Sequence, residues 1–76
     1  MKSIITNNKV EFGTMSFGTF SDPKVAIAVA EFVDENPVGR DLLHNAIIRG
    51  ASEEWVRKFL DVGFSYEGKN AEMARP

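Results

Sequence analysis

The fold is decided by residues 41–62, which read DLLHNAIIRGASEEWVRKFLDV. Apolar residues recur at helical spacing in both halves of this stretch. The first half predicts a short helix that begins near Asp41 and ends before Gly50. Its apolar face is made of Leu42, Leu43, Ala46 and Ile47. Ser52 can cap a second helix. That helix has a face made of Trp55, Val56, Phe59 and Leu60. Because a loop of about three residues joins the two, we expect a helical hairpin that Gly63 ends.

A longer helix is expected upstream, over residues 21–36. Ser21-Asp22-Pro23 offers side-chain oxygens that can cap a helix, followed by a proline that fits its first turn. Asn36-Pro37 should end it, because a proline disfavours helical dihedrals in the residue before it. The apolar stripe predicted for this helix consists of Val25, Ala28, Val29, Phe32 and Val33.

Residues 1–20 are expected to form a β element. Asn7-Asn8 favours a tight hairpin, since asparagine tolerates left-handed dihedrals. The alternation of apolar residues changes parity across Gly13-Thr14, which requires a turn or bulge before a third strand or extended arm. The side chains expected in the core here are Phe12, Met15, Phe17 and Phe20. The fold class predicted is therefore α+β: a single small domain with an N-terminal β-hairpin or meander followed by three helices.

Composition excludes several classes of protein. With 76 residues the chain makes one domain, and without cysteine it has no disulfide framework or thiolate zinc site. This favours a reducing, cytoplasmic setting. The strongest apolar run, Val25 to Ala30, is far shorter than a membrane helix needs. A net charge of −2 argues against a dedicated nucleic-acid binder, which concentrates basic residues.

No pattern in the sequence indicates catalysis, a cofactor or a metal. His44 is the single histidine and has no cysteine or second histidine to join it, so we expect it to tie its helix to a neighbouring segment. The neighbouring carboxylates Glu53 and Glu54 diverge on a helix and suit its N-terminal dipole better than acid–base chemistry. Trp55 is expected in the core, with an exposed interface residue as the alternative. We therefore expect no enzyme.

Residues 39–70 resemble an ankyrin repeat. Gly39-Arg40-Asp41-Leu42-Leu43-His44 matches the glycine and the Thr-Pro-Leu-His tetrapeptide of that family by position, although Asp41 replaces threonine and Leu42 replaces proline. Gly50 and Gly63 match the inter-helix turn and the terminating glycine. The resemblance implies a helical hairpin that binds protein. The binding residues carried over are Arg40, Asn45, Ile48, Arg49 and Lys69. Only one repeat is visible, and residues 71–76 read as a loose polar tail.

The function expected from these features is protein binding without chemistry, in the manner of a small adaptor, antitoxin or phage-type inhibitor that sequesters a larger protein. A lone repeat must be covered by something else, and a homodimer through residues 41–49 or 53–62 is one way to cover it. The alternative is a helix-turn-helix regulator, because Ala46, Gly50 and Val56 have the spacing of that motif. Glu53 and Glu54 at the start of its recognition helix argue against this reading.

Overall fold

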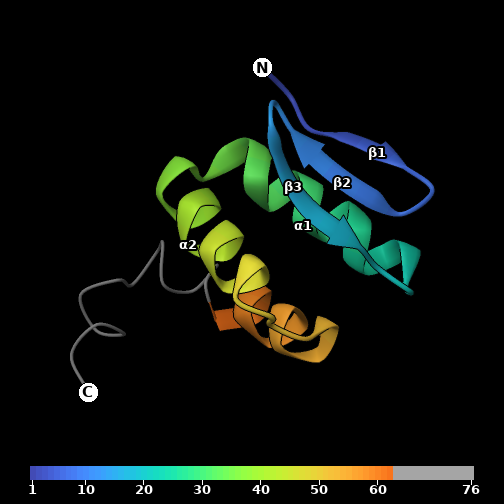
Figure 1. The fold of residues 1–76 in the computed structure, drawn as a ribbon. Coiled ribbons are helices and arrows are strands. Elements are labelled where there is room, and N and C mark those ends of the chain that lie inside the picture. The colour runs from blue at the N-terminus through green and yellow to red at the C-terminus, as the bar shows by residue number, and fades with distance from the viewer. Residues whose placement is uncertain (63–76) are drawn as a thin grey trace.

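The computed structural model describes residues 1–62, and its elements follow the order expected for the α+β class. Three strands come first: β1 (Ile4–Thr6), β2 (Lys9–Phe12) and β3 (Met15–Thr19). Two helices follow, α1 (Pro23–Glu35) and α2 (Pro37–Ile48), and residues 53–62 form a third helix. Figure 1 shows the sheet lying against α1 and α2, with the third helix beside them. The predicted fold class, a meander followed by three helices, is confirmed.

The sheet is an antiparallel meander in the order β1-β2-β3. Asn7 and Asn8 connect β1 to β2 with positive φ angles of 50° and 67°, as a tight hairpin requires. Gly13 turns the chain into β3 with φ of 61°. The register between β2 and β3 shifts between Lys9 and Glu11, so the irregularity that restores the alternation lies within β2 as well as at the turn.

α1 begins and ends where its capping residues place it. The Asp22 carboxylate accepts a hydrogen bond from the backbone N–H of Lys24, and Pro23 occupies the first turn. Asn36 ends the helix, with its backbone N–H bonded to the carbonyl of Phe32. The buried face is wider than the predicted stripe and is made of Val25, Ala26, Val29, Ala30, Phe32 and Val33. Ala28, expected on that stripe, is only half-buried.

α2 begins at Pro37, so the expected start near Asp41 was wrong. Pro37 ends the preceding helix and also opens the next one, because its fixed φ suits a first helical turn. Because α2 starts earlier than expected, Asn36 is the single residue that connects α1 to α2. Leu43 lies fully in the core, whereas Leu42, which was placed on the same face, is 50% exposed.

The third helix folds back after a glycine turn, as the sequence predicts. Gly50 has φ of 100°, and the Ser52 hydroxyl accepts a hydrogen bond from the backbone N–H of Trp55 at 3.0 Å. Val56 is buried, but Trp55 is 42% exposed and stacks on Phe59, with 5.2 Å between ring centroids. The expectation of Trp55 as a core residue was therefore wrong: the ring covers Phe59 from the solvent side.

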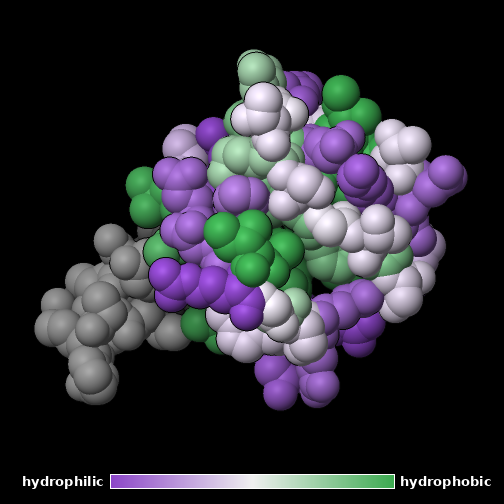
Figure 2. Space-filling view, in the orientation of Figure 1, coloured by the Kyte–Doolittle hydropathy of each residue, from purple (hydrophilic) through white to green (hydrophobic). Residues whose placement is uncertain are grey.

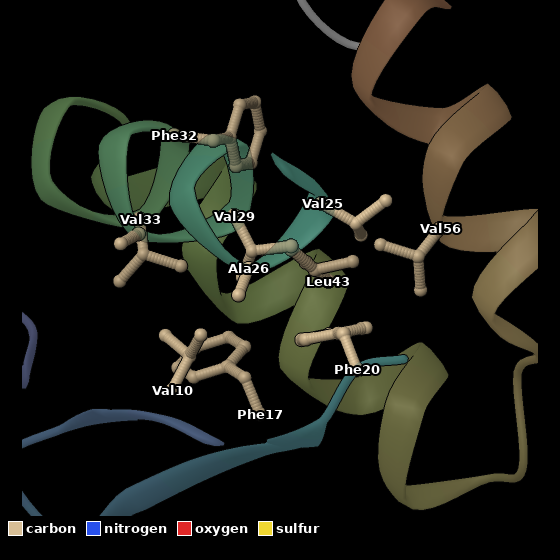
Figure 3. Packing of buried hydrophobic residues seen from close by; sticks show 11 residues of the cluster. Val10, Phe17, Phe20, Val25, Ala26, Val29, Phe32, Val33, Leu43 and Val56 are labelled. Carbon is tan, nitrogen blue, oxygen red and sulfur yellow. The ribbon is translucent and has the colours of Figure 1, made fainter. Parts of the chain in front are cut away.

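One hydrophobic core joins the sheet to all three helices. Figure 3 shows Val10 and Phe17 from the sheet facing residues of α1 and α2, with Val56 entering from the third helix. Phe17 and Phe20 are buried, while Phe12 and Met15 pack at the edge of this core. Within residues 1–62, no helix combines the length and hydrophobicity needed to cross a membrane.

Candidate functional site

Several of the expected binding residues lie together on the side of α2 that faces solvent. We call this side the outer face of α2. Its exposed residues are Val38, Asp41, Leu42, Asn45, Ile48 and Arg49. All of them recur at three- or four-residue spacing along the helix, which places them on one side. Figure 2 shows hydrophobic surface over α2 with hydrophilic side chains next to it.

Arg40 has partners inside the domain. Its Nε donates a hydrogen bond to the backbone carbonyl of Val33 at 2.9 Å, and its guanidinium lies 3.8 Å from the ring centroid of Phe12. These contacts join α2, α1 and β2 through one half-buried side chain. Arg40 therefore lies apart from the outer face of α2. Lys69, the fifth expected binding residue, lies outside the described residues.

His44 is half-buried, and its imidazole packs edge-on against Phe17 of β3, with 5.4 Å between ring centroids. His44 lies inside α2 rather than at its start, where the sequence analysis placed it, and this ring contact joins α2 to β3. Asp41, which replaces the threonine of the ankyrin pattern, makes no hydrogen bond to His44. In the described part of the chain, histidine and carboxylate side chains nowhere gather into a set of three metal ligands.

The basic residues of the third helix are already paired with carboxylates. Arg57 lies 3.3 Å from the Asp22 carboxylate, and Lys58 lies 3.8 Å from Glu54 one turn earlier on the same helix. A recognition helix in a DNA groove needs such side chains to reach phosphates and base edges. Their engagement within the chain counts against the helix-turn-helix alternative.

The carboxylate of Glu53 holds the start of α1, a role that the sequence analysis missed. One oxygen accepts hydrogen bonds from the backbone N–H of Ser21 at 2.8 Å and from its hydroxyl at 2.9 Å. The other oxygen accepts from the backbone N–H of Asp22 at 3.1 Å. Glu53 was read as a partner of its own helix dipole. Ser21 and Glu53 are 32 positions apart in the sequence, so only the tertiary fold shows that they are in contact.

These hydrogen bonds lower the pKa of Glu53. The bond from the Ser21 backbone is the largest cause; partial desolvation opposes it, and the bonds from the Asp22 backbone and the Ser21 hydroxyl add to the lowering. The nearby positive charge of Arg57 acts in the same direction. Each of these partners favours the ionised carboxylate over the protonated acid.

Because the pKa of Glu53 is lower in the folded than in the unfolded state, its contribution to stability is fully present above the ordinary glutamate pKa. The contribution is lost as the pH falls through the lowered, folded-state pKa. We expect Glu53→Gln to reduce the urea midpoint at about pH 7 and to flatten its decline toward about pH 3. Urea unfolding followed by circular dichroism across this interval measures both effects.

Glu54→Gln is the matched control, because Glu54 is the adjacent residue and, within residues 1–62, its carboxylate is paired only with Lys58, at the solvent-exposed surface. We expect it to keep the acid dependence of the wild-type protein. If the urea midpoint of Glu53→Gln fell with acid as steeply as that of the wild type, the hydrogen bonds from Ser21 and Asp22 to Glu53 would not contribute to stability.

Comparison with known proteins supplies no relative for this site. No protein-family model matches the sequence, no curated protein matches it, and no solved structure matches the fold.

Proposed function

We propose that this chain is a non-catalytic protein-binding module and that its contact surface is the outer face of α2. The observation that carries the proposal is the exposure of three large apolar side chains on one short helix. Val38 is 68% exposed, Leu42 50% and Ile48 64%. Single exposed apolar residues are common, but a group of them on one element is typical of an interaction surface.

The chemistry of the outer face suits a protein partner. Apolar side chains supply contact area, and Asn45 and Arg49 on the same side of the helix supply hydrogen-bond donors. Leu43 on the opposite side of α2 is fully buried, so the helix is anchored before any partner arrives. A pre-positioned helix binds with less loss of conformational entropy than a flexible segment does. It can lie in an apolar groove of the partner.

The ankyrin-like interpretation belongs to the same proposal. Two helices joined by a turn at Gly50 support it, and the segment that would form the finger, residues 63–70, lies outside the described residues. A module of this kind acts by occupying a surface of a larger protein, as adaptors and inhibitors do. The absence of cysteine from all 76 residues supports a cytoplasmic setting.

The experiment compares two isoleucines of nearly equal exposure. Ile48 on α2 is 64% exposed and Ile4 on β1 is 63% exposed. Tagged wild-type protein, Ile48→Lys and Ile4→Lys are used to isolate the partner from the native cell, and the affinity of each for the purified partner is then measured. We expect Ile48→Lys to weaken binding at least about tenfold, as removal of a central apolar contact does. Arg49→Glu should weaken it too, whereas Ile4→Lys should bind like the wild type.

Equal binding by Ile48→Lys and wild type would contradict the proposal. Light scattering of the three proteins at micromolar concentration tests the homodimer prediction at the same time. A dimer mass that Ile48→Lys reduces to that of one chain would identify the outer face of α2 as a contact between copies. A single-chain mass for the wild type would contradict the homodimer.

A further inference from the structure

A groove lies between α1 and the third helix, and it shares no residue with the outer face of α2. Its volume is about 310 Å³. The residues that line it are Ala28, Glu31, Phe32, Glu35, Asn36, Leu60 and Asp61. A second depression of about 230 Å³ shares Ala28, Leu60 and Asp61 with the first, so the hollow continues along both helices. Its far end is lined by Asp22, Lys24 and Arg57, so the acidic edge is confined to the first depression.

Glu31 and Glu35 form an uncompensated negative edge along this groove. They are one turn apart on α1, where like charges repel and destabilise a helix. They also lie near its C-terminus, the negative end of the helix dipole, and the last turn of α1 holds no basic residue. Within residues 1–62 neither carboxylate has a hydrogen bond or ion pair.

Most other carboxylates of the described chain do have partners. Asp22 pairs with Arg57, and Asp34 accepts hydrogen bonds from the backbone N–H and the hydroxyl of Ser3. Glu53 holds the start of α1, and Glu11 and Glu54 each lie beside a lysine. Within residues 1–62 no hydrogen bond or ion pair explains the position of Glu31 and Glu35. A neutral residue at either place would suit α1 better.

The floor of the groove is apolar. Ala28 and Leu60 are half-buried there, and the Phe32 ring contacts Phe59 edge-on behind them, with 5.4 Å between centroids. A ligand that suits this surface combines an apolar part for the floor with positive charge for Glu31 and Glu35. The volume is at the lower end of the range of roughly 300–1,000 Å³ for small-molecule sites. It accommodates a few side chains of a segment that lies across it.

We propose that this groove binds a cationic, amphipathic segment of a partner protein, with apolar side chains on Ala28 and Leu60 and lysine or arginine side chains against Glu31 and Glu35. Charge complementarity selects this occupant: the acidic edge disfavours an anionic or neutral segment, and the apolar floor adds contact area to the charge attraction. The groove and the outer face of α2 share no residue, so an experiment can contradict the proposal for one surface and leave the proposal for the other unaffected.

The probe is a short labelled peptide built only of leucine and lysine, and its binding is followed by fluorescence anisotropy. Two further peptides separate the contributions, one of serine and lysine and one of leucine and glutamate. We expect the leucine–lysine peptide to bind, the serine–lysine peptide to bind several-fold more weakly, and the leucine–glutamate peptide not to bind. Amide chemical shifts should change at Ala28, Glu31 and Leu60.

The double variant Glu31→Gln/Glu35→Gln should weaken binding of the leucine–lysine peptide roughly tenfold, because it removes both carboxylates that would pair with the lysines of the peptide. The matched control is Glu11→Gln/Glu54→Gln, which removes the same charge away from the groove and should change affinity less than about twofold. The groove variant should melt no lower than the wild type, because it removes a repulsion within α1. That result separates lost binding from lost folding.

Three outcomes would overturn the proposal. Equal weakening by both double variants would mean that the net charge of the chain attracts the peptide. Equal affinity of the serine–lysine and leucine–lysine peptides would mean that the apolar floor contributes nothing to binding. Shifts confined to the outer face of α2 would place the peptide on the surface of the proposed function, which would remain intact.

Discussion

Replacing Phe17 with alanine is expected to remove a large share of the free energy of unfolding, and in the lower part of the range given below to unfold the domain. Phe17 is fully buried, and its side chain lies between the sheet and the helices that cover it (Figure 3). Removing a buried phenylalanine side chain costs about 3–5 kcal/mol. At about 0.05–0.15 kcal/mol per residue, a chain of 76 residues has a total of about 4–11 kcal/mol. Urea unfolding followed by far-ultraviolet circular dichroism measures the loss.

Ile4→Ala is the control for this variant. Ile4 is a large apolar residue of the same sheet but is 63% exposed, so we expect its unfolding free energy to stay within about 0.5 kcal/mol of the wild type. If Phe17→Ala and Ile4→Ala unfolded at the same urea concentration, the packing of the sheet against α1 and α2 would not be as described.

Gly39→Ala is expected to destabilise the protein by about 1–3 kcal/mol, the usual cost of overpacking. Alanine is normally preferred over glycine in a helix by about 0.5–1 kcal/mol, so the expected sign is opposite to helix propensity. A Cβ at Gly39 would clash with Cζ of Phe32 and would lie 2.8 Å from its Cε2. Phe32 has little freedom to move aside because it is buried and contacts Phe59.

Val38→Ala checks that the effect belongs to the clash. Val38 is the preceding residue of the same helix and is 68% exposed, so its replacement should change stability by less than about 0.5 kcal/mol. In Gly39→Ala/Phe32→Leu the smaller side chain makes room, and the double variant should lose less than the sum of the two single losses. A stabilising Gly39→Ala would mean that α1 and α2 approach each other less closely here.

The sequence predicts best those features that neighbouring residues determine. The asparagine hairpin, the capping carboxylate of Asp22 and the glycine turn at Gly50 each depend on a few adjacent residues, and all three are found. Pro37 was misread because proline both ends one helix and begins another, and the sequence does not say whether the two are adjacent. Leu42 is one residue from the buried Leu43, about 100° around the helix, and the sequence alone does not say which side of this apolar stripe the rest of the domain covers.

The candidate surfaces were predictable only in part. Asn45, Ile48 and Arg49 were placed together by the resemblance to an ankyrin repeat, and the structure does bring them to one side of α2. The partners of Arg40 come from β2 and the end of α1, and local spacing carries no signal for contacts between distant segments. The groove beside Glu31 and Glu35 could not be predicted for the same reason: Leu60, which lines it, comes from a different helix that is distant in sequence.

The hold of Glu53 on Ser21 and Asp22 has a consequence for biosynthesis. Residues 1–50 leave the ribosome before Glu53 does, so the first turn of α1 emerges with the amides of Ser21 and Asp22 still lacking that carboxylate. Val56 reaches the core from the same late segment. The third helix can therefore make these contacts only after residues 1–50 have been synthesised, and a chain that ends before residue 53 lacks both of them.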